Sequence, residues 1–296
     1  MPQTPLVLLA GGFFLIVAGS TLFTRSLERT VLRFFNNKSR GLRILGNLSL
    51  SLPELLLPLI AFLTPGSGKS RVEAGTGALF GPPLFLLLFL VPLAFFLKPR
   101  ENRILAREIP LLLSGLALAL FLFGHSLLFR LPLALFLAGI YLWGLLSTPE
   151  DEAPQEVPEP GSPWGPFDAI SVVGGSLLMG GGSQLFLVGI DHLRSAQGIS
   201  PFWVALILAP LATEAPELLT LLHFLKKRSL SEGHSILWGS IHLQATLSIA
   251  LGLLASPWKG SAAARSAGES LLLILGALLL LSWRRSRKHS KPPLHP

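Results

Sequence analysis

The chain has 296 residues, of which 50% are hydrophobic and only 14% are charged, and its mean hydropathy is +0.61. These values lie outside the usual range of soluble globular domains and predict an integral membrane protein. The sequence contains no cysteine, which excludes both disulfides and thiolate metal sites.

Nine apolar stretches are long enough to cross a bilayer as helices. A hydrocarbon layer about 30 Å thick requires about 17–25 helical residues, and such long, unalternating runs do not fit the strands of a barrel. We therefore expect an all-α integral membrane protein with about nine transmembrane helices. In chain order the predicted spans are 6–24, 42–63, 76–97, 109–128, 131–147, 168–190, 201–224, 235–255 and 268–283. No Lys or Arg precedes Arg25, so the first span lacks the basic start of a signal peptide and is expected to be retained.

Lysine and arginine are distributed unevenly between the two sides of this arrangement. Of the 24 basic residues, 18 fall within residues 25–43, 98–107, 226–228 and 284–291, all on the same side. The positive-inside rule places that side in the cytoplasm, so we expect a multi-pass protein of the cell membrane with its N-terminus outside and its C-terminus inside. We interpret the net charge of +8 as topology and attraction to anionic lipid rather than as nucleic-acid binding.

The sequence contains an internal repeat. Residues 11–23 (GGFFLIVAGSTLF) match residues 174–186 (GGSLLMGGGSQLF) at an offset of 163 residues, and the same offset aligns SLPELL (51–56) with EAPELL (214–219). Five spans separate the two copies, so the second copy enters the membrane from the opposite side, as in the inverted repeats of secondary transporters. The predicted units are a first repeat (1–147), an acidic, Pro-rich linker (148–166), a second repeat (167–283) and a basic cytoplasmic tail (284–296).

Each repeat carries a Pro-Glu pair inside an apolar span. A proline within a helix frees a backbone carbonyl, and a bilayer offers no water to satisfy it, whereas a cation can. A carboxylate at the bilayer centre costs about 2.5–3.5 kcal/mol even on the lenient insertion scale, so it indicates function. Together the pairs predict a cluster of hard oxygen ligands of the kind that Ca²⁺ or Na⁺ prefers. The pairs are Pro53 with Glu54, and Pro216 with Glu217.

With these residues the chain resembles the calcium:cation antiporter superfamily, which includes the sodium/calcium exchangers. The family signature, Gly-(Ser/Thr)-Ser-x-Pro-Glu on helices two and seven, appears here as SLSLPE (49–54) and ATEAPE (212–217), the second similar to the variant of a prokaryotic branch. The resemblance implies ion transport by alternating access, with helices one and six sliding against the other helices. It also implies two repeats of five helices, of which we expect the tenth helix to be missing. The implied ligands are Glu54 and Glu217, with Ser51 and Thr213 as secondary ligands and backbone oxygens of Ser49 and Ala212.

The sequence departs from the family pattern around this site. Helices three (GTGALFGPPLF, 75–85) and eight (GSIHLQATLS, 239–248) lack the usual Asn or Asp, and His242 and Gln244 are the only large polar residues on helix eight. Glu214 replaces the signature Ser, one turn before Glu217 and on nearly the same helix face. Three roles stay open for Glu214. It supplies a missing ligand, it carries a proton because neighbouring carboxylates disfavour each other's ionisation, or it faces a water-filled vestibule.

The expected function is therefore secondary antiport of Ca²⁺ against Na⁺ or H⁺, with no cofactor and with the lipid bilayer as surroundings. Alternatives are antiport of H⁺ and another cation, or a transport-inactive ion sensor or scaffold of the same fold. A membrane enzyme is disfavoured because the chain has no His-Glu-x-x-His motif and its three aspartates lie in predicted loops or at helix ends. The sequence predicts no oligomeric state.

Overall fold

The fold was analysed in a computed structural model. It describes residues 4–34, 52–64, 68–94, 109, 112–113, 115–117, 127–147, 166–214, 218, 222, 226, 230–255 and 262–288. Over these ranges the regular structure is entirely helical and no strand occurs, which confirms the all-α prediction.

The described helices correspond to eight of the nine predicted spans, while 109–128 lies mostly outside the described ranges. Their bounds are α1 Thr4–Phe34, α3 Leu52–Leu63, α4 Lys69–Ala94, α6 Leu127–Ser147, α7 Pro166–Gln197, α8 Pro201–Thr213, α10 Leu230–Leu243, the π-helical turn η2 Gln244–Ser248, α11 Ile249–Ala255 and α12 Ala262–Lys288. Among these residues, five segments are long and apolar enough to cross a membrane: Thr4–Thr24, Lys69–Leu90, Leu127–Gly144, Phe167–Gln197 and Leu237–Ala255.

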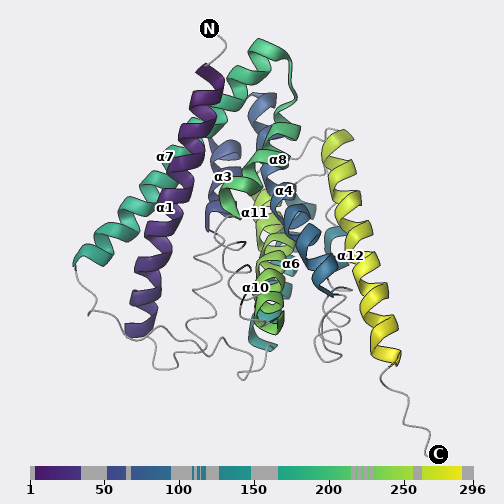
Figure 1. Cartoon of the computed structure of the whole chain (residues 1–296). Helices are drawn as coiled ribbons and strands as arrows, with labels where there is room; N and C mark the ends of the chain where they lie inside the picture. The colour runs from purple at the N-terminus through teal and green to yellow at the C-terminus, as the bar shows by residue number, and fades with distance from the viewer. Residues whose placement is uncertain are drawn as a thin grey trace, which may run out of the picture.

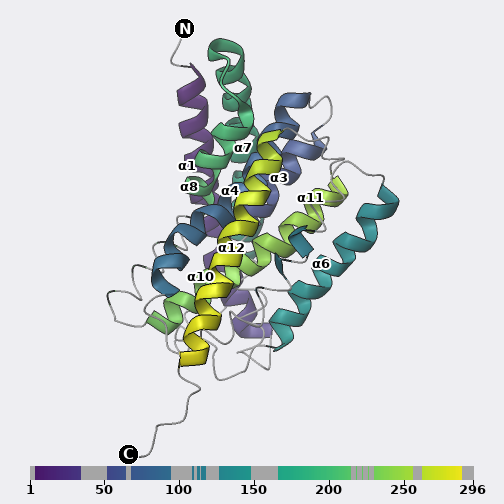
Figure 2. The same ribbon diagram turned by 90° about the vertical axis from the view of Figure 1, so that its right-hand side faces the viewer.

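The helices form a bundle with an attached helix pair. Figure 1 shows α1 and α7 crossing along one side, the shorter helices α3, α8, α10 and α11 grouped around α4, and α12 along the opposite side. Turning the molecule by 90° shows α6 as an outer helix beside α11 (Figure 2). The start of α1 and the end of α12 lie at opposite ends of the bundle in both views, as the predicted odd number of spans requires.

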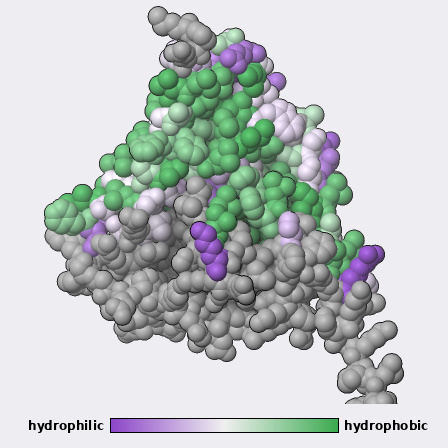
Figure 3. All heavy atoms as spheres, in the orientation of Figure 1, coloured by the Kyte–Doolittle hydropathy of each residue, from purple (hydrophilic) through white to green (hydrophobic). Residues whose placement is uncertain are grey.

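Apolar side chains fill the interior and also cover the outside. A buried cluster joins α4, α6, α10, α11 and α12, with Phe80, Leu137, Ile241 and Leu271 each fully or almost fully buried. Large apolar side chains are equally frequent on the surface, and Figure 3 shows them covering most of the described part of one face. Exposed apolar area of this extent suits contact with lipid chains rather than water.

The α1–α7 pair is packed backbone against backbone through glycines. A Cβ on Gly12 would lie 2.7 Å from the carbonyl oxygen of Gly182, and one on Gly182 would lie 2.9 Å from that of Gly12. Gly19 and Gly175 show the same relation at 2.7 and 2.8 Å. Side chains larger than hydrogen are therefore excluded at these four positions, as in other close membrane helix crossings.

These contacts are also reciprocal in the predicted repeat. At the offset of 163 residues Gly12 corresponds to Gly175 and Gly19 to Gly182, so the Gly12–Gly182 contact is the image of the Gly19–Gly175 contact. A twofold axis between two copies produces such exchanged pairs. The boundaries of the repeats stay predictions, and of the linker 148–166 only the last residue lies within the described ranges.

Two predicted spans are seen only as half-helices. α3 begins at Leu52, so Pro53 lies in its first turn, where a missing N–H removes no helical hydrogen bond. The predicted span over 201–224 is interrupted, because α8 ends at Thr213 and Glu214 forms a bend, while the N–H of Leu218 donates to the carbonyl oxygen of Glu214 at 3.0 Å. A proline disfavours helical backbone at the residue before it, which accounts for an interruption just ahead of Pro216.

We expect Gly182→Ala to lower the free energy of unfolding by about 1–3 kcal/mol, because the added methyl group would overlap the backbone of α1. Gly180→Ala is the matched control on the same helix. Nothing lies within 4 Å of a Cβ at that position, so the change should be neutral or stabilising. Thermal melting of the purified protein in detergent measures both, and equal melting temperatures for the two variants would contradict the close packing.

Candidate ion-binding site

The first carboxylate of the candidate site is Glu54, at the beginning of α3. It lies in the first helical turn directly after Pro53, and its side chain is 2% exposed. The first turn of a helix carries unsatisfied N–H groups and the positive end of the helix dipole, both of which stabilise a negative charge. The break that starts α3 therefore places a carboxylate in the interior where the local backbone favours it.

The second carboxylate is Glu214, at the end of α8. It is completely buried, and its backbone N–H donates to the carbonyl oxygen of Pro210 at 2.8 Å. The last turn of a helix presents carbonyl oxygens that attract cations. The site thus lies between the beginning of one half-helix and the end of another.

Close packing of α4 fixes the position of α8. A Cβ on Gly77 would lie 2.3 Å from the carbonyl oxygen of Phe202, and a Cβ on Gly81 would lie 2.5 Å from that of Leu206 and 2.9 Å from the ring of Pro210. The glycines of α4 therefore serve close packing rather than ion binding. They allow α8 to approach α4 until the buried end of α8 meets the neighbouring helices.

Gln244 joins the two carboxylates. Its side-chain amide nitrogen donates to Glu54 Oε2 at 2.5 Å and to Glu214 Oε1 at 3.0 Å, and the residue is 1% exposed. Both carboxylates therefore accept from the same amide nitrogen. Carboxylates 190 and 30 positions away along the chain thus converge on one amide, and we call the three residues the Glu54–Gln244–Glu214 cluster.

The cluster has oxygen atoms to offer to a cation. Glu214 Oε2 and Gln244 Oε1 are buried, and neither has a hydrogen-bond partner among the described residues. Buried polar atoms are nearly always paired, so such atoms indicate a ligand or a movement. Within the same ranges no group of three His, Cys, Asp or Glu side chains comes together, so the oxygen donors gathered here come from two acids and an amide.

A π-helical turn sets the direction of Gln244. This residue begins η2, which inserts one wide turn between α10 and α11. The Thr246 hydroxyl donates to the carbonyl oxygen of His242 at 2.5 Å and reaches that of Leu243 at 3.4 Å. The turn thereby keeps its backbone oxygens bonded while aiming one side chain at the carboxylates, a common use of π turns at functional sites.

His242 occupies the side of this helix that faces α6. The imidazole packs directly against Gly144 of α6. A Cβ at that position would overlap the ring carbon Cε1, so any larger residue at Gly144 would displace the imidazole. The ring also lies edge-on to Tyr141 and Trp238, with centroid distances of 6.2 and 6.4 Å. Aromatic packing thus holds the imidazole on the α6 side.

The remaining predicted ligands divide into two groups. Thr213 is buried beside Glu214, and its hydroxyl donates to the carbonyl oxygen of Ala209 at 3.2 Å and reaches Glu214 Oε1 at 3.5 Å. Ala212 is buried one residue earlier. The other predicted ligands, Ser49, Ser51 and Glu217, lie outside the described residues. Within the described residues, the carboxylate that shares the Gln244 amide with Glu54 is that of Glu214.

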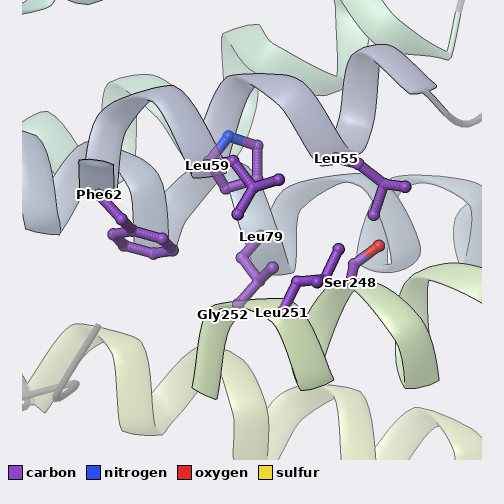
Figure 4. A pocket seen from close by; sticks show the side chains of 8 residues that line it. Leu55, Leu59, Phe62, Leu79, Ser248, Leu251 and Gly252 are labelled. Atoms are coloured by element: carbon purple, nitrogen blue, oxygen red, sulfur yellow. The ribbon is translucent and has the colours of Figure 1, made fainter. Parts of the chain in front are cut away.

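A narrow crevice adjoins the cluster between α3 and α11. Figure 4 shows the Ser248 hydroxyl among apolar side chains there, one turn beyond Gln244. This hydroxyl is buried without a hydrogen-bond partner in the described ranges, and the sequence reasoning missed it because only the π turn reveals its neighbours. The lining residues are Leu55, Pro58, Leu59, Phe62, Leu79, Ser248, Leu251 and Gly252.

Comparison with known structures identifies the same fold. The H⁺/Ca²⁺ exchanger CAX is 18% identical, with a TM-score of 0.65 over 96% of this chain and 85% of that chain. Native YfkE is 14% identical, with a TM-score of 0.64 over 96% and 98%. The sodium-calcium exchanger NCX_Mj, soaked without Na⁺ and Ca²⁺, is 18% identical, with a TM-score of 0.52 over 96% and 95%. At these identities the likeness concerns the fold.

A search of curated protein sequences gave no match. The family model for "Sodium/calcium exchanger protein" matches residues 4–147 and 168–292, which include both predicted repeats. This match confirms the resemblance inferred from the two Pro-Glu motifs. The chain is a multi-pass membrane protein that belongs to the sodium/calcium exchanger protein family.

Proposed function

We propose that this protein is a secondary antiporter that exchanges Ca²⁺ for H⁺ at the Glu54–Gln244–Glu214 cluster. The observation that carries the proposal is the burial of two carboxylates against one amide. Ca²⁺ takes six to eight oxygen ligands and binds carboxylate and amide oxygens in flexible arrangements. Ser51, Thr213 and Glu217, with backbone oxygens of Ser49 and Ala212, are the further ligands we propose.

The geometry supports a proton as the counter-ion. Two buried carboxylates that share one amide donor repel each other, so one of them retains a proton when no cation is present. Binding of Ca²⁺ displaces that proton, and release of Ca²⁺ allows it to return. Competition for the same oxygens then couples the two ions without a separate proton site. Na⁺ is the alternative counter-ion, since it competes for oxygen ligands in the same way.

Gln244 has different roles in the two states. With no cation present, its amide N–H groups satisfy the carboxylate oxygens. A bound cation repels those hydrogens, and rotation of the amide about its last side-chain bond brings Oε1 to the ion instead. An amide offers both a donor and an acceptor in one planar group, which a third carboxylate at this position would not.

The proposed orientation follows the distribution of basic residues. The N-terminus lies outside and the C-terminus lies in the cytoplasm of a cell membrane, which places the end of the bundle near Thr64 and Gln197 outside. The protein acts as a transporter rather than an enzyme, and requires no cofactor for ion exchange.

Glu54→Gln and Glu214→Gln should each abolish Ca²⁺ exchange, because either change removes a charged ligand and a proton acceptor. Uptake of radioactive Ca²⁺ into proteoliposomes, driven in separate experiments by an outward H⁺ and an outward Na⁺ gradient, measures the effect. Glu269→Gln, which changes an exposed acid on α12, is the matched control and should transport normally. Uptake driven by Na⁺ alone would refute proton coupling. Ca²⁺ binding without uptake under either gradient would favour a sensor.

The apparent affinity for Ca²⁺ should rise with pH. Protons and Ca²⁺ compete for the same carboxylates, so each competing proton changes KM by up to about tenfold per pH unit in the range where the site titrates. Initial rates of uptake at several Ca²⁺ concentrations between pH 6 and 8 give the slope. A KM independent of pH throughout that range would exclude direct competition.

Gln244→Leu should destabilise the ion-free protein. It leaves two buried carboxyl groups without their shared donor, and hydrogen bonds to charged groups contribute about 1.5–3 kcal/mol each. Melting in detergent with a chelator present measures this loss. Gln197→Leu removes an exposed amide from α7 and should leave the melting temperature unchanged; a similar shift in both variants would contradict the structural role of Gln244.

A further inference from the structure

A polar network connects α7 to α4 at the end of the bundle opposite the α12 C-terminus. Asp191 of α7 accepts a hydrogen bond from the Ser70 hydroxyl at 2.6 Å and an ion-pair hydrogen bond from Arg71 Nε at 3.1 Å. The Arg71 side chain is 16% exposed and that of Asp191 is 34% exposed, so water screens this pair only in part. Charge-assisted bonds of this kind are directional and stronger than neutral ones.

The network continues into α3. Arg71 Nη1 donates to Gln184 Oε1 at 3.1 Å, and Gln184 Nε2 donates to Thr64 Oγ1 at 2.9 Å. The Thr64 hydroxyl in turn donates to the carbonyl oxygen of Ile60 at 2.6 Å, in the last turn of α3. Side chains more than 110 positions apart thus form one chain of bonds. We call Thr64, Ser70, Arg71, Gln184 and Asp191 the α7 clamp.

The position of the clamp relates it to the ion site. α3 is a single short helix that begins next to Glu54 and ends next to Thr64, so it joins the buried carboxylate to the clamp. On its other side α7 is packed against α1 through glycine backbones, which makes α1 and α7 one body. A shift of that body away from α4 breaks the bonds of the clamp and parts α7 from the end of α3, while α3 stays packed on α4 at Gly75.

We propose that the α7 clamp is a latch that closes this end of the protein, and that its opening gives the Glu54–Gln244–Glu214 cluster access to the solution on that side. The clamp holds the α1–α7 pair against α3 and α4 in the closed state. Its contacts are short polar bonds rather than interdigitated apolar side chains, so they exchange for bonds to water when the pair moves away. The inference concerns access to the site and does not depend on which ion is transported.

The test uses distances between spin labels. The sequence has no cysteine, so Gly68→Cys and Ala196→Cys introduce the only two labelling sites. Both positions are exposed, a Cβ on Gly68 would have nothing within 4 Å, and neither residue belongs to the clamp. Pulsed electron paramagnetic resonance on the labelled protein in lipid nanodiscs, without added cation, reports the distance between α4 and α7.

The labelled parent should give one narrow distribution of short distances. Asp191→Asn, which removes the ion pair, and Gln184→Leu, which removes the contacts to Arg71 and Thr64, should each transfer at least a third of the molecules to longer distances. Ser70→Ala should do so to a smaller extent. Lys69→Gln is the control, because it removes a charge at the same end but leaves the clamp and the 3.9 Å ion pair between Glu73 of α4 and Arg194 of α7 in place.

Two results would overturn the latch. Parent-like distributions in both Asp191→Asn and Gln184→Leu would mean that these bonds do not hold the closed state. A shift in Lys69→Gln as large as that in Asp191→Asn would mean that surface charge in general, rather than the clamp, sets the distance. Gel filtration confirms that each variant is folded, and no transport measurement enters the comparison.

Discussion

Two carboxylates buried against a single amide govern how the surrounding helices are arranged. In the interior of a membrane protein an unpaired charge is expensive, and water is not available to satisfy it. Glu54 lies in the first turn of α3, Glu214 lies at the bend after α8, and Gln244 begins the π turn between α10 and α11. Each break in regular helix therefore serves the same cluster. A continuous helix at any of the three positions would point its side chain elsewhere.

The helices around the cluster are joined by two kinds of contact, close backbone packing at glycines and a few side-chain hydrogen bonds. α4 and α8 meet through glycines, with backbone against backbone, and the apolar cluster around Phe80 anchors α4 to α10, α11 and α12. α7 meets α1 equally closely, yet its polar contacts with α4 are a handful of side-chain bonds. This difference suits the proposed antiport, because closely packed helices move as a unit and separate from their neighbours where only a few side-chain bonds join them.

The sequence predicted the class of fold and named all three residues of the cluster, but it did not predict how they meet. Apolar length indicated the spans, the alignment of the chain with itself indicated the repeat, and the Pro-Glu motif indicated Glu54, because these signals can be read directly from the order of the residues. Glu214 was predicted only as one of several possible roles. Its burial depends on where α8 ends, and the structure shows this bend two residues before Pro216. Gln244 was named as a polar candidate, but its two hydrogen bonds depend on a π turn that hydrophobic periodicity does not reveal.

The clamp could not be predicted from the sequence for a different reason. Arg71 and Asp191 lie near predicted span ends, where charged residues are common and usually solvated. Only the approach of α4 to α7 distinguishes them from other charges near span ends such as Lys69, which is largely exposed. Long-range pairing of this kind requires the tertiary arrangement, whereas the repeat required only an alignment of the chain with itself.

The π turn has a consequence for how the family can vary. Each residue in an α-helix rotates the following face by about 100°, so the extra residue in η2 changes which side of the helix faces α3 and α8 from that point onward. Removing one residue between Gln244 and Ser248 would restore a regular helix and turn α11 relative to α10. A relative one residue shorter here would therefore present another face of α11 to α3 without any substitution in the motifs. In this part of the protein the number of residues, as much as their identity, decides which side chains face the neighbouring helices.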